Sequence, residues 1–351
     1  MIIRLRRKSV AVLSGVLALF LLVFGLAFFF ARAKDEKGES DKKAYIKWVE
    51  FSPGLKALED TIELDKKTYD SLYHISWIDS LSYLAVKNGN NFKGYKSRDL
   101  QKMTELLGDS KTIEDLVGEN KYFSYYKEAF SATLGGLLGE YERQVPDGNG
   151  GVTVKTGYGL VAYSPIAEGF AYSHYDDFGS SRSYGYRRSH LGNDLLGNVG
   201  TPVVAVEGGV VECIGWNQYG GWRLGIRSFD GKRSYYYAHL RKDRPYHSDI
   251  KQGTLVKAGQ VIGYMGMTGY SVKENVNGMS VPHLHFGLQL IFDESQKEGT
   301  NQIWLDVYSL VKLLSKNRAT VVKDEKTGDY FRKYDIIDKR WPDELKQKGL
   351  S

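Results

Sequence analysis

The 351-residue chain has a single cysteine, Cys213, which excludes an internal disulfide framework and a metal site built from several thiolates. Cys213 lies in the alternating run 210–214, and we interpret it as a small buried residue of a strand. A net positive charge is also lacking beyond the first 34 residues. The formal charge of +6 is matched by six basic residues in that segment, so residues 35–351 carry no net charge. Because nucleic-acid binding domains normally show a basic excess, we expect no nucleic-acid partner.

Long apolar runs are scarce, with one exception from Val10 to Ala31. Roughly twenty such residues span a bilayer as a helix, so residues 1–34 are predicted to be a cytoplasmic basic tip and a transmembrane anchor. The basic flank would place the N-terminus in the cytoplasm and the rest of the chain outside the cell membrane. A cleaved signal peptide ending near Ala31-Arg32-Ala33 is the alternative, although its apolar core would usually be shorter.

The remaining chain divides by composition, and we expect an α+β protein. Residues 35–44 are a charged stalk, 45–144 a small helical domain, 145–154 a linker of turn-forming residues, and 155–312 an all-β antiparallel domain, with a C-terminal extension at 313–351. Helical spacing of Leu72, Ile75, Ile78 and Leu81 supports the helical part, and Thr112 to Asp115 resembles a capping box.

Short β-like runs separated by glycine turns dominate the second half of the chain. Strands are expected within 201–206, 210–214, 255–263 and 281–288, followed by a closing helix at 304–316. His283 and His285 stand two apart in the last of these strands, so both imidazoles should project from the same face. One strand therefore offers two nitrogen ligands to one site.

Two further clusters could complete that site. His190 and Asp194 lie four apart, and His239 ends the aromatic run 235–239. Neutral imidazoles with one carboxylate are the donors of a hydrolytic zinc site, because three N/O ligands leave a fourth position open for water. Spacing alone does not decide which histidines bind the metal.

Together these motifs resemble the lysostaphin/LytM-type zinc endopeptidases of peptidase family M23. The resemblance covers roughly residues 155–312 and rests on His-x-Gly-x-Asp at 190–194, His239-Leu240, His283-x-His285-Phe286-Gly287, and the glycine-rich runs 200–211 and 257–269. It implies that His190, Asp194 and His285 bind one Zn²⁺. His239 and His283 would be catalytic, with His283 the candidate general base, although spacing does not settle which of the two takes the proton.

The resemblance also implies hydrolysis of peptide bonds in peptidoglycan stem peptides or cross-bridges, in wall remodelling, division or sporulation. Two stretches depart from the family pattern, the polar aromatic segment 172–186 and the long loop 270–281, so substrate preference does not transfer. His74, His174 and His247 are interpreted as structural, although His174 could line the cleft.

Two other functions remain open on the sequence. A non-catalytic module of the same fold could bind cell wall or a partner protein, and a zinc hydrolase of another class, such as an amidase, would differ in the order of its ligand motifs. The complete ligand set favours the endopeptidase, because a purely binding module has no chemical need for it.

Overall fold

The computed structural model describes residues 45–108, 111–299 and 301–340. The described residues from 46 onward form one compact unit. The expected membrane helix and the stalk at 35–44 lie outside the described residues. Within the described ranges, no helix combines the length and apolarity needed to cross a bilayer.

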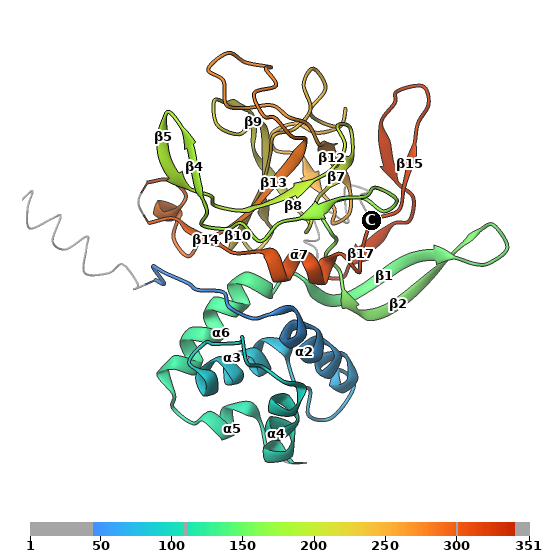
Figure 1. Cartoon of the computed structure of the whole chain (residues 1–351). Coiled ribbons are helices and arrows are strands. Elements are labelled where there is room, and N and C mark those ends of the chain that lie inside the picture. Colours follow the sequence, from blue (N-terminus) through green and yellow to red (C-terminus); the bar gives the residue numbers. More distant parts are fainter. Residues whose placement is uncertain (1–44, 109–110, 300, 341–351) are drawn as a thin grey trace, which may run out of the picture. The chain divides into compact units, whose positions relative to one another are not determined.

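Five helices occupy the region that was expected to be helical (Figure 1). They are α2 (Leu55–Thr68), α3 (Trp77–Asn88), α4 (Ser97–Leu107), α5 (Ile113–Val117) and α6 (Lys121–Leu134). The capping box of α5 is present, with Thr112 Oγ1 accepting from Asp115 N and Asp115 Oδ2 accepting from Thr112 N. These five helices pack against one another through buried apolar faces.

The expected helical periodicity across Leu72 and Ile75 is wrong, because both residues lie in the connection between α2 and α3. Leu72 is 88% exposed. Buried Asp65 holds this connection by accepting hydrogen bonds from Trp77 N at 2.7 Å and from His74 at 2.7 Å. Ser76 then caps α3 by accepting from Ile78 N, so a new helix starts where one continuous helix was expected.

The segment expected as a linker is instead the tip of a β-hairpin. Strands β1 (Leu138–Pro146) and β2 (Val152–Leu160) pair along their whole length, and β17 (Ile336–Asp338) adds a third strand. Asp147 Oδ1 accepts hydrogen bonds from Asn149 N and Gly151 N, which closes the turn. Turn-forming residues therefore reverse the chain here.

An antiparallel sheet forms the second half of the unit, as expected. Its order is β11 (Leu255–Val256), β8 (Gly209–Asn217), β9 (Gly221–Ser228), β10 (Arg233–Ala238), β13 (His283–Leu290), β6 (Asn193–Leu196) and β3 (Ser173–His174), and β14 (Ile303–Leu305) also pairs with β13. Three smaller pairs accompany it: β7 (Pro202–Val204) with β12 (Val261–Tyr264), β4 (Ser181–Tyr184) with β5 (Tyr186–Ser189), and β15 (Val321–Lys323) with β16 (Tyr330–Arg332). The closing helix, α7 (Tyr308–Leu314), is shorter than expected because residues 303–305 are strand.

Side chains of each strand point alternately to the two faces of the sheet, so one face is buried in the core and the other is open. On β13, Leu284, Phe286, Leu288 and Leu290 are fully buried in the core. His283 and His285 occupy the intervening positions and therefore project from the opposite face. The sheet thus supplies a rigid platform on which the two histidines stand side by side.

Arg233 joins the sheet to the helical region. Its side chain is 1% exposed, and it pairs with Glu207 at 2.8 Å and Asp230 at 2.7 Å. Its Nη1 also donates to the backbone carbonyl of Ala132, at the C-terminal part of α6, at 2.6 Å. Burial lowers the pKa of Arg233, whereas the negative charge of Glu207 raises it. The effect of the charge is larger, so the pKa of Arg233 lies above its ordinary value.

Candidate metal and catalytic site

The three predicted ligands meet where β6 pairs with β13. The antiparallel register sets His285 directly opposite Asp194. His190 Nε2 lies 2.7 Å from His285 Nδ1, and Asp194 Oδ1 lies 3.1 Å and 3.4 Å from those two atoms. One donor atom from each residue falls within 4.8 Å of the others. The structure therefore brings the three predicted ligands together in one cluster.

The donor atoms of this cluster fit a divalent metal. Asp194 Oδ1 is buried and receives no hydrogen bond. His190 Nδ1 lies 3.1 Å from the carbonyl oxygen of Asp177 and 3.2 Å from Arg182 Nη2, and Nε2 faces the cluster. A metal held by Nε2 would require the hydrogen to lie on Nδ1, where the Asp177 carbonyl can accept it. Two imidazole nitrogens and one carboxylate oxygen are a set that Zn²⁺ prefers.

The charges of the cluster stabilise one another. Burial disfavours the ionised Asp194 carboxylate, but contacts with His190 and His285 outweigh burial and hold its pKa well below the ordinary range. Burial likewise opposes protonation of His190, yet Asp177 and Asp194 raise its pKa to about 9. Burial lowers the pKa of His285.

His239 and His283 lie beside this cluster, with their rings 4.7 Å apart. Each ring is oriented by a backbone carbonyl: His239 Nδ1 donates to Thr268 O at 2.7 Å, and His283 Nδ1 donates to Val281 O at 2.8 Å. Both rings therefore keep a lone pair on Nε2, and His283 Nε2 lies 3.8 Å from Asp194 Oδ1. Burial holds the pKa of His239 well below its ordinary value.

His239 also has an unusual backbone conformation. It directly follows β10 with a φ of +58°, in the left-handed region that non-glycine residues seldom occupy. Its amide donates to Gly220 O at 2.8 Å, which holds the residue in place. Such strained residues concentrate at functional sites, and here the strained residue is one that the sequence also singled out.

Two glycines of the histidine motifs, Gly192 and Gly287, stand where two segments of the chain lie too close together for a side chain. A Cβ on Gly192 would lie 2.5 Å from Phe286 O and 2.8 Å from His285 Cε1. A Cβ on Gly287 would lie 2.9 Å from Leu191 O. The segment carrying His190 can therefore lie against the strand carrying His285 only because both positions lack a side chain.

Sequence reasoning missed two residues that contact the cluster, Asp177 and Arg182. Arg182 Nη2 donates to Asp177 Oδ2 at 2.6 Å and to Asp194 Oδ2 at 3.0 Å. Asp194 thus gives one oxygen to Arg182 and turns the other toward the histidines. Both residues belong to the segment 172–186, whose polar composition gives no periodic signal.

The two segments that depart from the family pattern meet at the same site. Tyr184 of β4 stacks on Tyr270 of the loop 270–281, with ring centroids 4.9 Å apart. Tyr219 contacts Tyr184 edge-on. Within the loop, Asn275 Oδ1 accepts from Trp222 Nε1 at 2.8 Å. The loops are therefore packed against one another above the sheet.

The other histidines lie where structural roles were expected, with one exception. His74 bonds to Asp65, and buried His247 accepts from Asp249 N. His174 packs on Tyr308 at 4.5 Å, but both its ring nitrogens are buried without hydrogen bonds. Asn193 Oδ1 accepts a hydrogen bond from Val307 N at 3.1 Å, which joins β6 to the start of α7.

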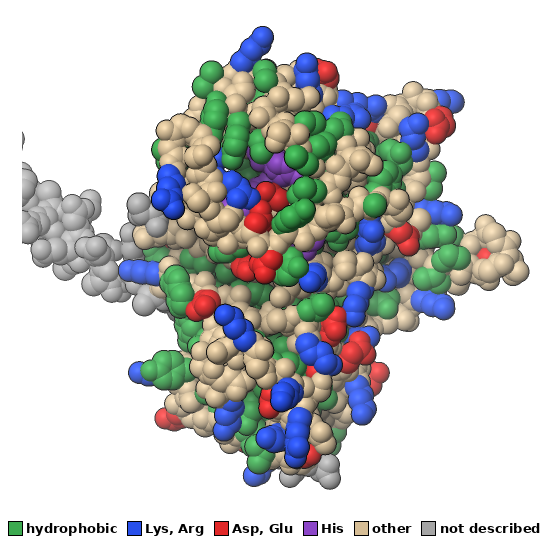
Figure 2. Space-filling model, in the orientation of Figure 1, with side chains coloured by type: hydrophobic (Ala, Val, Ile, Leu, Met, Phe, Trp, Pro, Cys, Tyr) green, Lys and Arg blue, Asp and Glu red, His purple; other side chains and the backbone are tan. Residues whose placement is uncertain are grey.

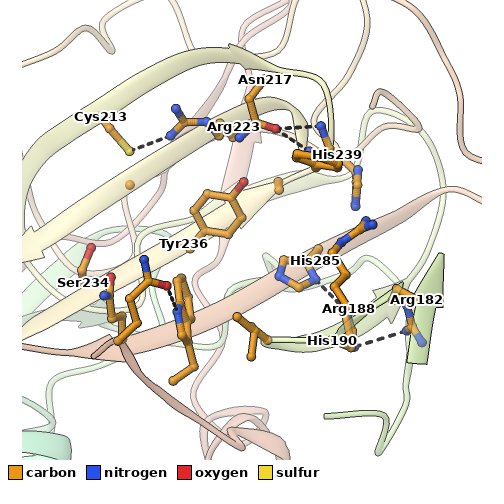
Figure 3. A pocket seen from close by; sticks show the side chains of 18 of the residues that line it. Arg182, Arg188, His190, Cys213, Asn217, Arg223, Ser234, Tyr236, His239 and His285 are labelled. Carbon is orange, nitrogen blue, oxygen red and sulfur yellow. Dashed lines mark hydrogen bonds between the residues drawn. The ribbon is translucent and has the colours of Figure 1, made fainter. Parts of the chain in front are cut away.

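A groove of about 700 Å³ extends from the cluster across β13, β10, β9 and β8. Figure 2 shows histidine side chains inside a hollow on this face of the molecule. In Figure 3, Tyr236 lies between His285 on one side and the Cys213–Arg223 pair on the other.

Cys213 is half-buried and lines the groove, so the expectation of a buried hydrophobic cysteine is wrong. The β-bulge between Val211 and Cys213 shifts the register there.

Part of the chain is similar in sequence to known endopeptidases. The chain is 42% identical over 117 residues to an L-Ala–D-Glu endopeptidase of Bacillus subtilis (strain 168), covering 33% of this chain and 34% of that protein. It is 42% identical over 99 residues to the glycyl-glycine endopeptidase ALE-1 of Staphylococcus capitis, covering 28% of this chain and 24% of that protein. The chain thus spans about a third or less of the length of these relatives.

A solved structure extends the likeness beyond the site. The crystal structure of a putative glycyl-glycine endopeptidase lytM from Ruminococcus gnavus matches with a TM-score of 0.51 and 24% identity, covering 76% of this chain and 89% of that chain. At this identity the match shows the fold alone. In the sequence comparison, residues 188–298 match Peptidase family M23. This matched segment contains His190, Asp194, His239, His283 and His285, so the similarity to the family includes the whole site.

Proposed function

We propose that the protein is a zinc-dependent endopeptidase that hydrolyses peptide bonds of peptidoglycan. The convergence of His190, Asp194 and His285 in one cluster, with two further histidines beside it, carries the proposal. The names of both relatives denote endopeptidases, which supports the reaction class. They denote different bonds, so relatedness leaves the cleaved bond open.

His190 Nε2, His285 Nδ1 and Asp194 Oδ1 would hold the ion. Bound Zn²⁺ would polarise the scissile carbonyl and make water acidic enough to attack near neutral pH. The proton of the attacking water is accepted at His283 Nε2, because Nδ1 of that ring is already engaged with Val281 O.

His239 is proposed to orient the water or the base through Nε2. A direct hydrogen bond from His239 to the developing oxyanion would need a hydrogen on Nε2, whereas the Thr268 carbonyl keeps the hydrogen on Nδ1. This contact supports an orienting role for His239 over a role in binding the oxyanion. The strained backbone fixes the ring for this purpose.

The test is digestion of purified peptidoglycans of different cross-bridge chemistry with residues 35–351, followed by mass analysis of the fragments. Cleavage should disappear with a chelator and return with Zn²⁺. His190→Ala and Asp194→Ala should each lose metal and activity together, because each removes a ligand. Full zinc occupancy of both variants, measured by elemental analysis, would refute the assigned ligands. Binding of peptidoglycan without cleavage would support the non-catalytic module instead.

A further inference from the structure

The groove continues well beyond the cluster, and the sheet register shows what lies there. His285 pairs with Ala238 of β10, and Tyr236 pairs with Gly225 of β9. Continuing this register places Arg223 beside Ala238, on the same open face. Asp194, His285, Ala238 and Arg223 thus form one row across four strands, and all four line the groove.

The guanidinium of Arg223 has little to bind within the protein. Its Nη1 donates to Cys213 Sγ at 3.2 Å, and a thiol is a weak acceptor. Its Nε is buried and has no hydrogen-bond partner. Among the described residues, no carboxylate makes a salt bridge with Arg223. A half-buried cation with an unused donor is costly unless a ligand completes it.

Arg188 of β5 is a second arginine of this kind in the groove. Its guanidinium lies 4.9 Å from the ring centroid of Tyr219 and 5.2 Å from that of Tyr270. Its Nη1 is buried without a hydrogen-bond partner, and it too lines the groove. No salt bridge to Arg188 occurs within the described ranges.

Other cations of the groove differ, because acidic partners already neutralise them. Lys297 pairs with Glu212 at 2.5 Å. Arg182 pairs with Asp177 and Asp194. Two arginines of the groove therefore remain with positive charge available to a ligand, Arg223 and Arg188. Figure 3 shows both among the side chains that line the groove.

We propose that Arg223 and Arg188 bind free carboxylates of an acidic peptide substrate, so that the groove prefers acidic over neutral peptides. This inference rests on the endopeptidase function proposed above. Arg223 stands two strands from His285, which is roughly 10 Å between Cα atoms at the usual strand spacing. An extended peptide advances roughly 3.3 Å per residue, so the carboxylate read by Arg223 lies about three residues from the scissile bond.

The test compares peptides of equal length that differ in one group. One contains a γ-linked glutamate with a free α-carboxylate, the second carries a carboxamide in its place, and the third is pentaglycine. The wild-type enzyme should cleave the carboxylate peptide with the highest kcat/KM. Arg223→Gln and Arg188→Gln should each lower kcat/KM for this peptide roughly 10- to 100-fold, the worth of a charge-assisted hydrogen bond, while the carboxamide peptide changes less than about threefold.

Two controls accompany these variants. Arg187→Gln removes an exposed arginine that neighbours Arg188 on β5 and does not line the groove, so it should leave both rates unchanged. Arg223→Lys keeps the charge and should restore part of the preference. Zinc content and retained cleavage of the carboxamide peptide show that each variant is folded.

Three outcomes separate the two proposals. Equal wild-type rates for the carboxylate and carboxamide peptides would overturn the arginine proposal and leave the endopeptidase function intact. Equal losses on both peptides in Arg223→Gln and Arg188→Gln would also overturn it. If wild-type enzyme cleaves no peptide or peptidoglycan, the endopeptidase function fails, and calorimetric binding of the same peptides then decides the arginine proposal by the same preference.

Discussion

His283 and His285 share one face of β13, but they present different nitrogens to the site. His283 Nδ1 is tied to Val281 O, so Nε2 faces the cluster. His285 instead turns Nδ1 toward His190, at 2.7 Å. Spacing in the sequence predicts that both rings reach one site, whereas only the hydrogen bonds of the fold distinguish a ligand from a base.

Replacement of these histidines should separate the two roles. We expect His283→Ala to retain nearly stoichiometric zinc while hydrolysis falls roughly 10²–10⁴-fold, the usual contribution of a positioned general base. His239→Ala should behave in the same way. His285→Ala should lose the metal, since two ligands hold zinc poorly. Zinc retained in His285→Ala and lost in His283→Ala would reverse the roles.

His174 should make the protein sensitive to acid. Burial and the nearby charge of Lys312 lower the pKa of His174 to about 4, despite Asp177, from an unfolded value of about 6.5. Between these values the unfolded chain binds the proton and the folded chain does not, so the free energy of unfolding falls as pH decreases from 6.5 to 4.

The variant His174→Phe preserves packing on Tyr308 and removes the titrating group. Denaturant unfolding at several pH values should show a shallower loss of stability between pH 6.5 and 4 in the variant than in the wild type. Parallel curves for the two proteins would contradict the assigned pKa.

At the level of elements, the strands and their glycines were predictable because they follow local rules. The short β-like runs placed β8 and β13 near their observed positions, and the motifs pointed to His190, Asp194 and His285, which the structure brings together. The hairpin of β1 and β2 was missed, because turn residues signal a reversal and a linker equally. Arg182 was missed because its contact with Asp194 depends on how a long polar segment folds back.

The β4–β5 hairpin should influence metal affinity through Arg182. We expect Arg182→Gln to weaken zinc binding roughly 10- to 100-fold, since residues that orient a metal ligand typically contribute this much. Arg187→Gln, an exposed change on the same hairpin, is the matched control. Competition with a chromogenic chelator measures the affinity, and equal affinities of the two variants would remove Arg182 from the site.

The sheet and the helices should depend on each other through Arg233. Arg233→Ala leaves Glu207 partly buried without its partner and removes the bond to Ala132 O, so we expect a loss of about 3–5 kcal/mol in the free energy of unfolding. Lys323→Ala, which breaks an exposed pair with Glu325, should cost less than about 1 kcal/mol. Urea unfolding compares them, and a similar small loss in both would show that Arg233 is dispensable.

For the whole molecule, we propose attachment to the cell membrane by residues 10–31, with the N-terminus in the cytoplasm and the M23 domain outside. The apolar run and its basic flank support this proposal. The full-length protein should therefore sediment with membranes and remain there after a salt wash. N-terminal sequencing provides the contrary outcome: a soluble product beginning near Lys34 would identify a cleaved signal peptide.

The row of side chains across the sheet also has an evolutionary consequence. The proposed chemistry resides on β6, the end of β10 and β13. Arg223, one of the two arginines proposed to bind the substrate, stands one strand further, on β9. Ala238, between them, adds only a methyl group. Under the two proposals above, a single substitution at position 223 is expected to change the preferred substrate without disturbing the groups proposed for hydrolysis. Substrate preference set by position 223 can therefore change during evolution while the proposed reaction stays the same.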